Sequence, residues 1–266
     1  MTEVVRFSAN VGFLWPELDL PDRIVAAGRA GFSAVECHLP YDHPPDRIVA
    51  AMVEGDVEMI GLNTDPGPNG PADFGLAARP GREGEARAAI DQAVAYADAI
   101  GCRHVNVVPG LTGGTPEAEV VFRANLAYAC ERAAIGGRTV VIEPLSPRAV
   151  PGAHLRSVEA GLATLTAVGA DNLKLMFDCY HVQVAQGDVT ARLRSAIEHL
   201  GHVQIAAVPD RGEPDTGELD YRYLLAELDR LGYSGWVGAE YHPRGGTDAG
   251  LGWRDRLATS RTEDVE

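Results

Sequence analysis

The sequence predicts one α/β domain folded as a (β/α)₈ (TIM) barrel, and three observations support this prediction. Short apolar stretches with strand character alternate eight times with stretches of helical spacing, the order expected of a parallel sheet. Polar residues end nearly every strand, and a barrel gathers all eight strand ends at one rim, whereas an open sheet needs such residues only near its switch point. The length of 266 residues fits one undivided barrel. We therefore expect residues 1–266 to form a single domain, with about 244–266 as a C-terminal extension.

The first half of the chain contains four predicted strands with three predicted helices between them. The first strand ends at Asn10, and the next helix begins after the Asp19 cap with Pro21 in its first turn. The segment 64–80 is dense in Gly and Pro and too long for an ordinary connection, so we expect either an active-site lid or a disordered loop. The predicted strands are 4–9, 33–37, 57–62 and 104–108, and the predicted helices are 20–30, 46–54 and 83–100.

The second half repeats the pattern. Thr115, Pro116 and Glu117 read as a cap, a first-turn proline and an acidic first turn of a helix. Helices end at a glycine that is followed at once by a strand, because the residue past a helix C-terminus usually has a left-handed conformation. The predicted strands are 138–142, 173–177, 203–206 and 235–239, the predicted helices are 116–134, 157–168, 181–200 and 219–231, and one short helix is expected in the tail.

The composition argues against several classes of function. The 38 acidic and 23 basic residues give a formal net charge of −15, which opposes nucleic-acid binding because that affinity rests on Lys and Arg neutralising phosphates. The four cysteines show no paired spacing, so neither a disulfide framework nor a cysteine-based zinc site is expected. The N-terminus shows no charged leader followed by an apolar block, as a secretory signal would, and no run approaches the roughly 20 apolar residues of a membrane span. We therefore expect a cytoplasmic protein without a membrane span.

Four oxygen-bearing side chains stand at the ends of four successive strands: Glu143, Asp178, Gln204 and Glu240. They are 35, 26 and 36 residues apart, close to the roughly 31 residues of one βα unit in a barrel of about 250 residues. Glu143 and Glu240 could instead cap the following helix or pair with an arginine, and Gln204 could satisfy its hydrogen bonds on the backbone. Because buried carboxylates are rare unless paired or bound to metal, the set predicts a metal site. Three carboxylates and an amide suit Mg²⁺ or Mn²⁺, with Zn²⁺ or Co²⁺ as further candidates.

Other polar residues near these strand ends have two readings each. His181 forms D-x-x-H with Asp178 at a strand-to-helix turn, which fits either an ordinary N-cap or a contact with metal or substrate. Arg211, in the loop after the seventh strand, is either a solvated arginine among acids or the group that holds a substrate carboxylate. His202 shares a strand face with Gln204 and so points into the barrel. The remaining histidines are expected to serve as surface or core hydrogen-bond partners; they are His38, His43, His104, His154, His199 and His242.

Several motifs resemble the hydroxypyruvate isomerase family, part of the wider barrel superfamily of xylose-isomerase-like sugar isomerases and epimerases. They are I-E-P-L-S-P-R-A-V-P-G (142–152), F-D-C-Y-H-V-Q (177–183), H-V-Q-I-A-A-V-P-D-R-G-E-P-D-T-G-E (202–218) and V-G-A-E-Y (237–241), with matches at 31–42 and 75–83. The resemblance implies metal ligation by Glu143, Asp178, Gln204 and Glu240. It implies that Glu143 and Glu240 form the acid/base pair and that His181 and Arg211 contact the substrate. The family commonly shows Gly-Arg-His in the seventh loop, where this chain has Asp210, Arg211 and Gly212.

The resemblance implies a metal-assisted isomerisation of the aldose–ketose type that acts on a small hydroxy-carbonyl acid through an enediolate. Hydroxypyruvate to tartronate semialdehyde is the leading case. A ketose 3-epimerase or another sugar(-acid) isomerase is the alternative, although a histidine usually stands where this chain has Gln204. An endonuclease IV-like enzyme fits less well, because Asn63 and Asn106 stand where its histidines would be needed. A non-catalytic sugar-acid binding protein would not need both Glu143 and Glu240. The expected partner is a small molecule, without nucleic acid or membrane, and a homo-oligomer is compatible with the sequence.

Overall fold

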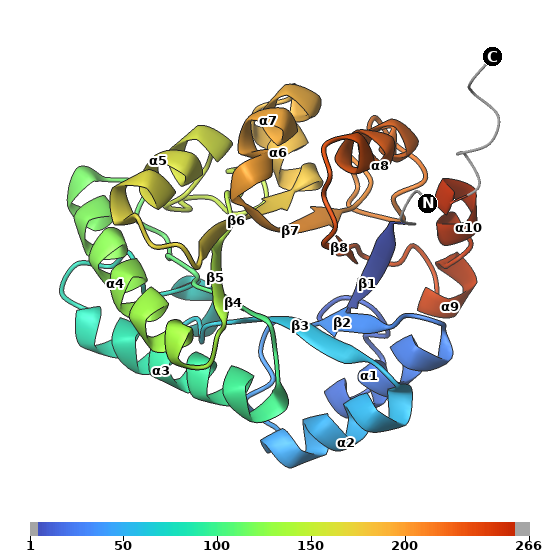
Figure 1. The fold of residues 1–266 in the computed structure, drawn as a ribbon, viewed down its shortest axis with the longest axis horizontal. Coiled ribbons are helices and arrows are strands. Elements are labelled where there is room, and N and C mark those ends of the chain that lie inside the picture. Colours follow the sequence, from blue (N-terminus) through green and yellow to red (C-terminus); the bar gives the residue numbers. More distant parts are fainter. Residues whose placement is uncertain (1–4, 259–266) are drawn as a thin grey trace.

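A computed structural model describes residues 5–258 and shows a closed barrel of eight parallel strands (Figure 1). Each strand pairs with its neighbours in chain order, and β1 pairs with β8 to close the ring. The prediction of a single (β/α)₈ barrel is therefore confirmed. The strands are β1 (Arg6–Asn10), β2 (Ala34–Glu36), β3 (Glu58–Asn63), β4 (His104–Asn106), β5 (Thr139–Ile142), β6 (Leu173–Asp178), β7 (Leu200–Ile205) and β8 (Trp236–Ala239).

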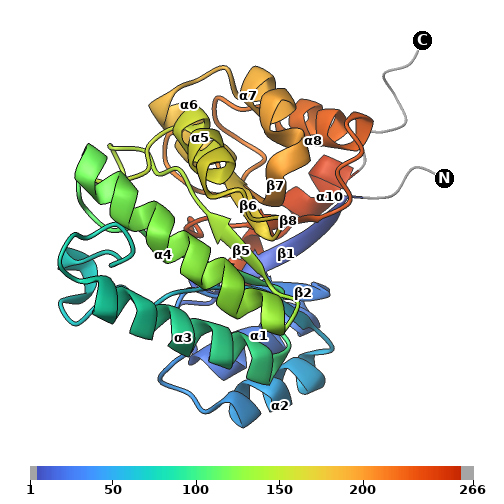
Figure 2. The same ribbon diagram turned by 60° about the vertical axis from the view of Figure 1, so that its left-hand side comes forward.

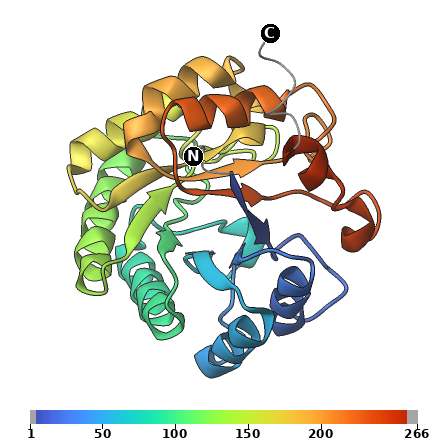
Figure 3. The ribbon, with the colours of Figure 1, turned by 45° about the vertical axis from the view of Figure 1, so that its right-hand side comes forward.

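Helices surround the strands on the outside of the barrel (Figures 1 and 3). The long helices α3 and α4 run side by side there, as Figure 2 shows most clearly. The α-helices are α1 (Leu20–Arg29), α2 (Pro45–Gly55), α3 (Glu83–Ile100), α4 (Pro116–Ile135), α5 (Val158–Val168), α6 (Cys179–Ala185), α7 (Val189–Ala196), α8 (Tyr221–Arg230), α9 (Thr247–Gly250) and α10 (Trp253–Ala258). Short 3₁₀ turns are η1 (Gly70–Ala72) and η2 (Ile197–His199). Among the described residues, no helix combines the length and apolarity that a membrane crossing requires.

The expected helix 181–200 is wrong as a single element. The chain forms α6 and α7 instead, with a break at Gly187 and Asp188, whose φ angles of 66° and 48° lie in the left-handed region. A right-handed helix cannot continue through two such residues. After α7, η2 leads into β7, which begins at Leu200 rather than at residue 203. The predicted start of the first strand at Val4 lies outside the described residues.

The Gly- and Pro-dense segment and the described part of the tail both contain regular structure. Residues 64–80 contain η1, and Asp73 within them is buried and paired with Arg79 and Arg82 at 2.9 and 2.8 Å. The expectation of one short helix in the tail is wrong, because the described part of the tail contains α9 and α10. Trp253, at the start of α10, is fully buried and its indole N–H donates to Tyr241 at 3.0 Å. The tail up to residue 258 therefore packs as part of the domain.

Close packing of α1 against α2 depends on a missing side chain. A Cβ atom added at Gly28 in α1 would lie 1.9 Å from the backbone oxygen of Gly55 in α2. Because backbone atoms cannot move aside as a flexible side chain can, the helices would have to separate.

We therefore expect Gly28→Ala to lower the free energy of unfolding by about 1–3 kcal/mol, the usual cost of overpacking. Gly84→Ala is the matched control, since its Cβ would meet no atom within 4 Å in α3. That change should stabilise the protein by about 0.5–1 kcal/mol through helix propensity. Thermal unfolding followed by circular dichroism measures both, and equal midpoints for the two variants would contradict this account of the α1–α2 contact.

Candidate metal and substrate site

The predicted ligands lie at or just past the carboxyl ends of β5 to β8. Side chains alternate along a strand, so residues two apart share one face. Gln204 in β7 shares the inner face with His202, and Asp178, the last residue of β6, pairs in register with Gln204. Glu143 and Glu240 directly follow β5 and β8. Gln204, Glu143 and Glu240 line one small cavity of about 20 Å³. The eight strand ends thus meet at one rim, as expected.

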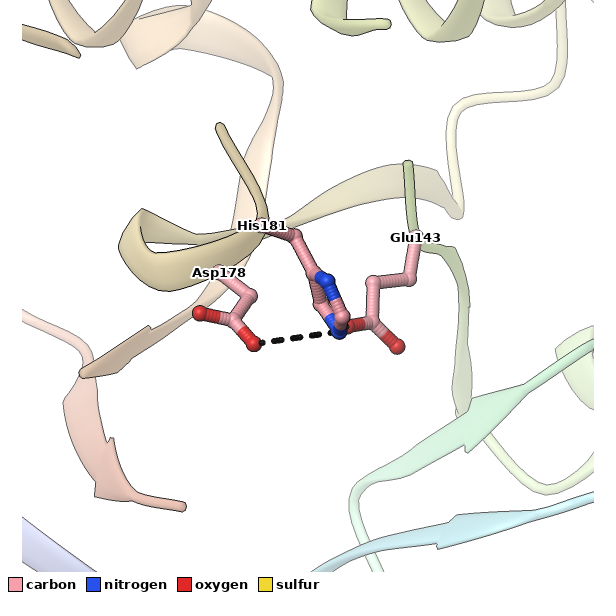
Figure 4. Close-up of side chains that lie close together, drawn as sticks. All are labelled: Glu143, Asp178 and His181. Carbon is pink, nitrogen blue, oxygen red and sulfur yellow. Dashed lines mark ion pairs between the residues drawn. The ribbon is translucent and has the colours of Figure 1, made fainter. Parts of the chain in front are cut away.

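Glu143, Asp178 and His181 form a compact cluster (Figure 4). One ligand atom from each lies within 4.8 Å of the others. His181 Nε2 lies 3.6 Å from Asp178 Oδ2 and 3.8 Å from Glu143 Oε1. Asp178 caps α6 by accepting from Tyr180 N–H at 2.8 Å, which fixes the turn that carries His181. The D-x-x-H motif is therefore both an N-cap and a contact within the site.

The surroundings of His181 keep its imidazole neutral and determine which ring nitrogen carries the hydrogen. Burial lowers its pKa to about 3, and the nearby charge of Arg211 adds to this shift. The backbone N–H of Ser146 donates to Nδ1 at 3.3 Å, so Nδ1 carries no hydrogen. The hydrogen of the neutral ring then lies on Nε2, the atom that faces the two carboxylates. Nε2 therefore has a hydrogen to donate, and it lies 3.6 and 3.8 Å from the carboxylate oxygens, beyond hydrogen-bond distance.

Arg211 connects two of the carboxylates. Its Nη2 lies 2.7 Å from Glu240 Oε2 and 3.3 Å from Asp178 Oδ2. The guanidinium carbon lies 5.0 Å from the ring centre of Phe13 and 5.1 Å from that of Tyr180. Its side chain is only 17% exposed, so the alternative of a solvated loop arginine is wrong.

Glu240 is further held by two side chains from the start of the barrel. Its Oε1 accepts from Asn10 at 3.2 Å and lies 3.1 Å from His38 Nε2. His38 follows β2, and Asn10 ends β1. The pairing of β1 with β8 brings these residues to Glu240 across more than 200 positions of sequence. His38 therefore belongs to the site, although the sequence suggested only a generic hydrogen-bond partner.

The three carboxylates have different protonation behaviour. Burial raises the pKa of Glu143 well above its usual value, and the charges of Glu240 and Asp178 add to the shift. Burial also raises the pKa of Asp178 to about 7, although Arg211 opposes this. Burial would raise the pKa of Glu240 too, but Arg211 and the His38 hydrogen bond outweigh it and hold the pKa at about 2. A further positive charge would stabilise the ionised forms of Glu143 and Asp178.

The donor set fits a divalent cation. Three carboxylates converge here, and burial disfavours the charged form of each. Gln204 Oε1 is buried and accepts no hydrogen bond from residues 5–258. Orphaned buried oxygens are rare unless a ligand or ion satisfies them. Oxygen donors of this kind suit Mg²⁺ or Mn²⁺.

A cavity of about 530 Å³ lies over these residues. Glu143, His181, Arg211 and Glu240 line its polar side. Its apolar wall includes Phe13, Leu39, Phe74, Leu145 and Val150. Phe74 belongs to segment 64–80, so this segment forms part of the cavity wall.

The unusual residues of the seventh loop are explained by Arg244. Asp210 accepts from Arg244 Nε at 2.8 Å and from its Nη2 at 3.1 Å, so the extra carboxylate is neutralised by a two-pronged ion pair. A Cβ atom at Gly212 would lie 2.6 Å from Arg244 Cζ, so the missing side chain makes room for this guanidinium. Asp210 and Gly212 thus act together and leave Arg211 facing the site.

Known proteins of one family resemble this chain over most of its length. The family model described as "Xylose isomerase-like TIM barrel" matches residues 24–261. The chain belongs to the xylose isomerase-like TIM barrel family. Among curated relatives, a 2-oxo-tetronate isomerase of Cupriavidus necator is 43% identical over 93% of this chain and 96% of the relative. The hydroxypyruvate isomerase of Escherichia coli K12 is 35% identical over 95% and 99%. This xylose isomerase-like barrel is therefore an isomerase of the aldose–ketose type.

Solved structures of other proteins share the barrel architecture of this chain. A crystal structure of a protein called AP endonuclease, family 2, from Brucella melitensis has a TM-score of 0.92 and 38% identity, covering 95% of this chain and 98% of the other. D-Allulose 3-epimerase of Methylomonas sp., in complex with D-allulose, has a TM-score of 0.75 and covers 96% of this chain and 91% of the other. At 19% identity that second likeness concerns the fold alone.

Proposed function

We propose that this protein is a divalent-metal-dependent isomerase that interconverts a small hydroxy-keto acid and its aldehyde isomer. One observation carries the proposal: the buried Asp178 and Glu240, the largely buried Glu143 and a Gln204 oxygen without a hydrogen-bond partner among residues 5–258 lie beside cavities that Arg211 and a neutral His181 also line. The resemblance of the chain to hydroxypyruvate and 2-oxo-tetronate isomerases supports the same class of substrate.

Glu143, Asp178, Gln204 and Glu240 would hold the ion. When bound, a divalent cation polarises a carbonyl and stabilises negative charge that develops on its oxygen. His181, whose Nε2 carries a hydrogen, would donate to a substrate oxygen rather than bind the ion. Arg211 would hold the substrate carboxylate, because Nη2 serves both Asp178 and Glu240 and the guanidinium has further N–H groups.

Glu143 and Glu240 would share the proton transfer. One would remove the proton from the carbon beside the carbonyl, and the other would deliver a proton at the neighbouring carbon. Both side chains line the 530 Å³ cavity, from the ends of β5 and β8. The apolar wall, to which segment 64–80 contributes, would limit the access of water to the proton being moved.

Hydroxypyruvate is the leading substrate, and a four-carbon 2-oxo acid is the second candidate, favoured by the 43% identity to the 2-oxo-tetronate isomerase. A ketose 3-epimerase remains the alternative reaction of the same fold. Mg²⁺ and Mn²⁺ are the proposed metals, with Zn²⁺ or Co²⁺ next. A small-molecule partner, the absence of nucleic-acid binding and a cytoplasmic location stay predictions.

The proposal is tested by removing and restoring metal. We expect the chelated protein to lose at least about 100-fold of its turnover of hydroxypyruvate, and Mn²⁺ to restore it, because electrostatic stabilisation is usually the largest catalytic contribution. Metal analysis, turnover of 2-oxo-tetronate and a ketohexose panel are measured in parallel. Full activity after complete chelation would overturn the metal requirement. Turnover of ketohexoses alone would replace the keto-acid substrate with a sugar.

A further inference from the structure

A fourth carboxylate of the barrel interior, Glu36, lines the same 20 Å³ cavity as Glu143, Gln204 and Glu240 and contacts Gln204. Glu36, the last residue of β2, is 3% exposed and points into the barrel. Its Oε2 accepts from Gln204 Nε2 at 3.3 Å and lies 2.9 Å from His202 Nε2. Glu36 thus spans the interior from β2 to β7.

Gly238 in β8 makes this contact across the barrel possible. A Cβ atom there would lie 2.2 Å from Glu36 Oε1, 2.8 Å from His202 Nε2 and 3.1 Å from Gln204 Cγ. All three neighbours would have to move if residue 238 carried a side chain. The glycine therefore keeps the space in which Glu36 reaches Gln204.

The contact fixes which end of the Gln204 amide faces the site. A carboxylate only accepts hydrogen bonds, so the amide must turn its NH₂ group toward Glu36. Its carbonyl oxygen, Oε1, then points away from Glu36. This oxygen is buried and accepts no hydrogen bond from residues 5–258. Gln204 lines the 20 Å³ cavity together with Glu143 and Glu240, a space for about one water-sized occupant.

We propose that Glu36 is a positioning residue that holds the Gln204 amide with its carbonyl oxygen presented to the divalent cation. The inference rests on the proposed metal site. Without Glu36, the amide could turn over and present its NH₂ group, which repels a cation. Partners that orient metal ligands in this way typically contribute about 10–100-fold to metal affinity.

Calorimetric titration of the metal-free protein with Mn²⁺ tests this role directly. We expect Glu36→Leu, which removes the acceptor, to weaken Mn²⁺ binding about 10–100-fold. Glu36→Gln keeps an acceptor oxygen within reach of Gln204 and should restore most of the affinity. Glu227→Leu is the matched control, since it removes another carboxylate that is 6% exposed but lies in α8, away from the site.

A double-mutant cycle separates positioning from a general structural effect. If Glu36 acts through Gln204, Glu36→Leu should cause no further loss of Mn²⁺ affinity in a Gln204→Leu background. Should Glu36→Leu fail to fold, Glu36→Asp keeps the charge but withdraws the carboxylate from Gln204, and it should also weaken binding. Wild-type-like Mn²⁺ affinity in the folded Glu36 variants would overturn this inference alone. No Mn²⁺ binding by the wild-type protein would overturn the proposed metal site and this inference with it.

Discussion

Glu143→Gln is expected to lower turnover of the substrate by about 10²–10⁴-fold at saturating Mn²⁺, while the barrel stays folded. The amide keeps the size of the side chain and an oxygen atom but cannot take up or release the proton. General acid–base catalysis typically accelerates a reaction by about 10²–10⁴-fold, so its loss should reduce the rate by this factor. The fold should tolerate the change, because burial already raises the pKa of Glu143 and an uncharged group suits that position. Turnover is followed by NMR in ²H₂O, where loss of hydrogen exchange at the substrate carbon reports the proton transfer itself.

Glu131→Gln on α4 provides the matched control, because it makes the same chemical change at an exposed position. It should leave turnover unchanged. Glu240→Gln should resemble Glu143→Gln in activity but also loosen Arg211, since Glu240 Oε2 is the acceptor 2.7 Å from Nη2. If Glu143→Gln kept more than about a tenth of wild-type turnover, Glu143 could not serve as an acid or base.

Arg211→Met is expected to reduce kcat/KM by about 10²–10³-fold, mainly through a higher KM. Removing one partner of a buried charge pair typically costs about 2–5 kcal/mol. The variant would lack the planar group that lies between Phe13 and Tyr180 and faces the cavity. Mn²⁺ affinity should not fall, because the guanidinium and a divalent ion seek the same oxygens of Asp178 and Glu240.

Two measurements separate substrate binding from general damage. Steady-state kinetics at saturating Mn²⁺ gives KM and kcat, and calorimetry gives the Mn²⁺ affinity of each variant. Arg211→Lys keeps the positive charge but lacks the planar guanidinium that can bind a carboxylate through two N–H groups. It should therefore recover only part of the activity. Arg222→Met, at an exposed arginine 62% accessible on α8, should behave as wild type. An unchanged KM together with weaker Mn²⁺ binding would show that Arg211 supports the metal ligands and does not hold substrate.

The fold followed from local features of the sequence. Polar residues at strand ends and glycines after helices are local signals that a short stretch of sequence contains. The alternation of strands and helices could therefore be predicted. The break between α6 and α7 was missed although Gly187 and Asp188 form a recognisable breaker pair, because the apolar periodicity continues on both sides. Here backbone conformation at two residues outweighed the helical pattern.

The sequence could suggest candidate site residues only where they come from successive strands. Glu143, Asp178 and Glu240 became candidates through their spacing along the chain, and their role as metal ligands stays a prediction. His38 was missed as a neighbour of Glu240, and Glu36 as a neighbour of Gln204, because barrel closure and crossing of the interior bring them together over 202 and 168 positions. The role of Gly212 was hidden for the same reason, since Arg244, the side chain that needs its space, follows β8. Contacts of this kind have no local signal.

The pairing of β1 with β8 also has a consequence for synthesis of the protein. Strand β1 can pair with β8 only after residues 236–239 have left the ribosome. One edge of β1 therefore stays unpaired while most of the chain is synthesised. Such edges can pair with other chains, so we expect the nascent protein to be prone to aggregation until β8 is available. A chain that stops before residue 236 would lack Glu240 and also leave both β1 and β7 open, so aggregation, rather than a folded inactive enzyme, is its expected fate.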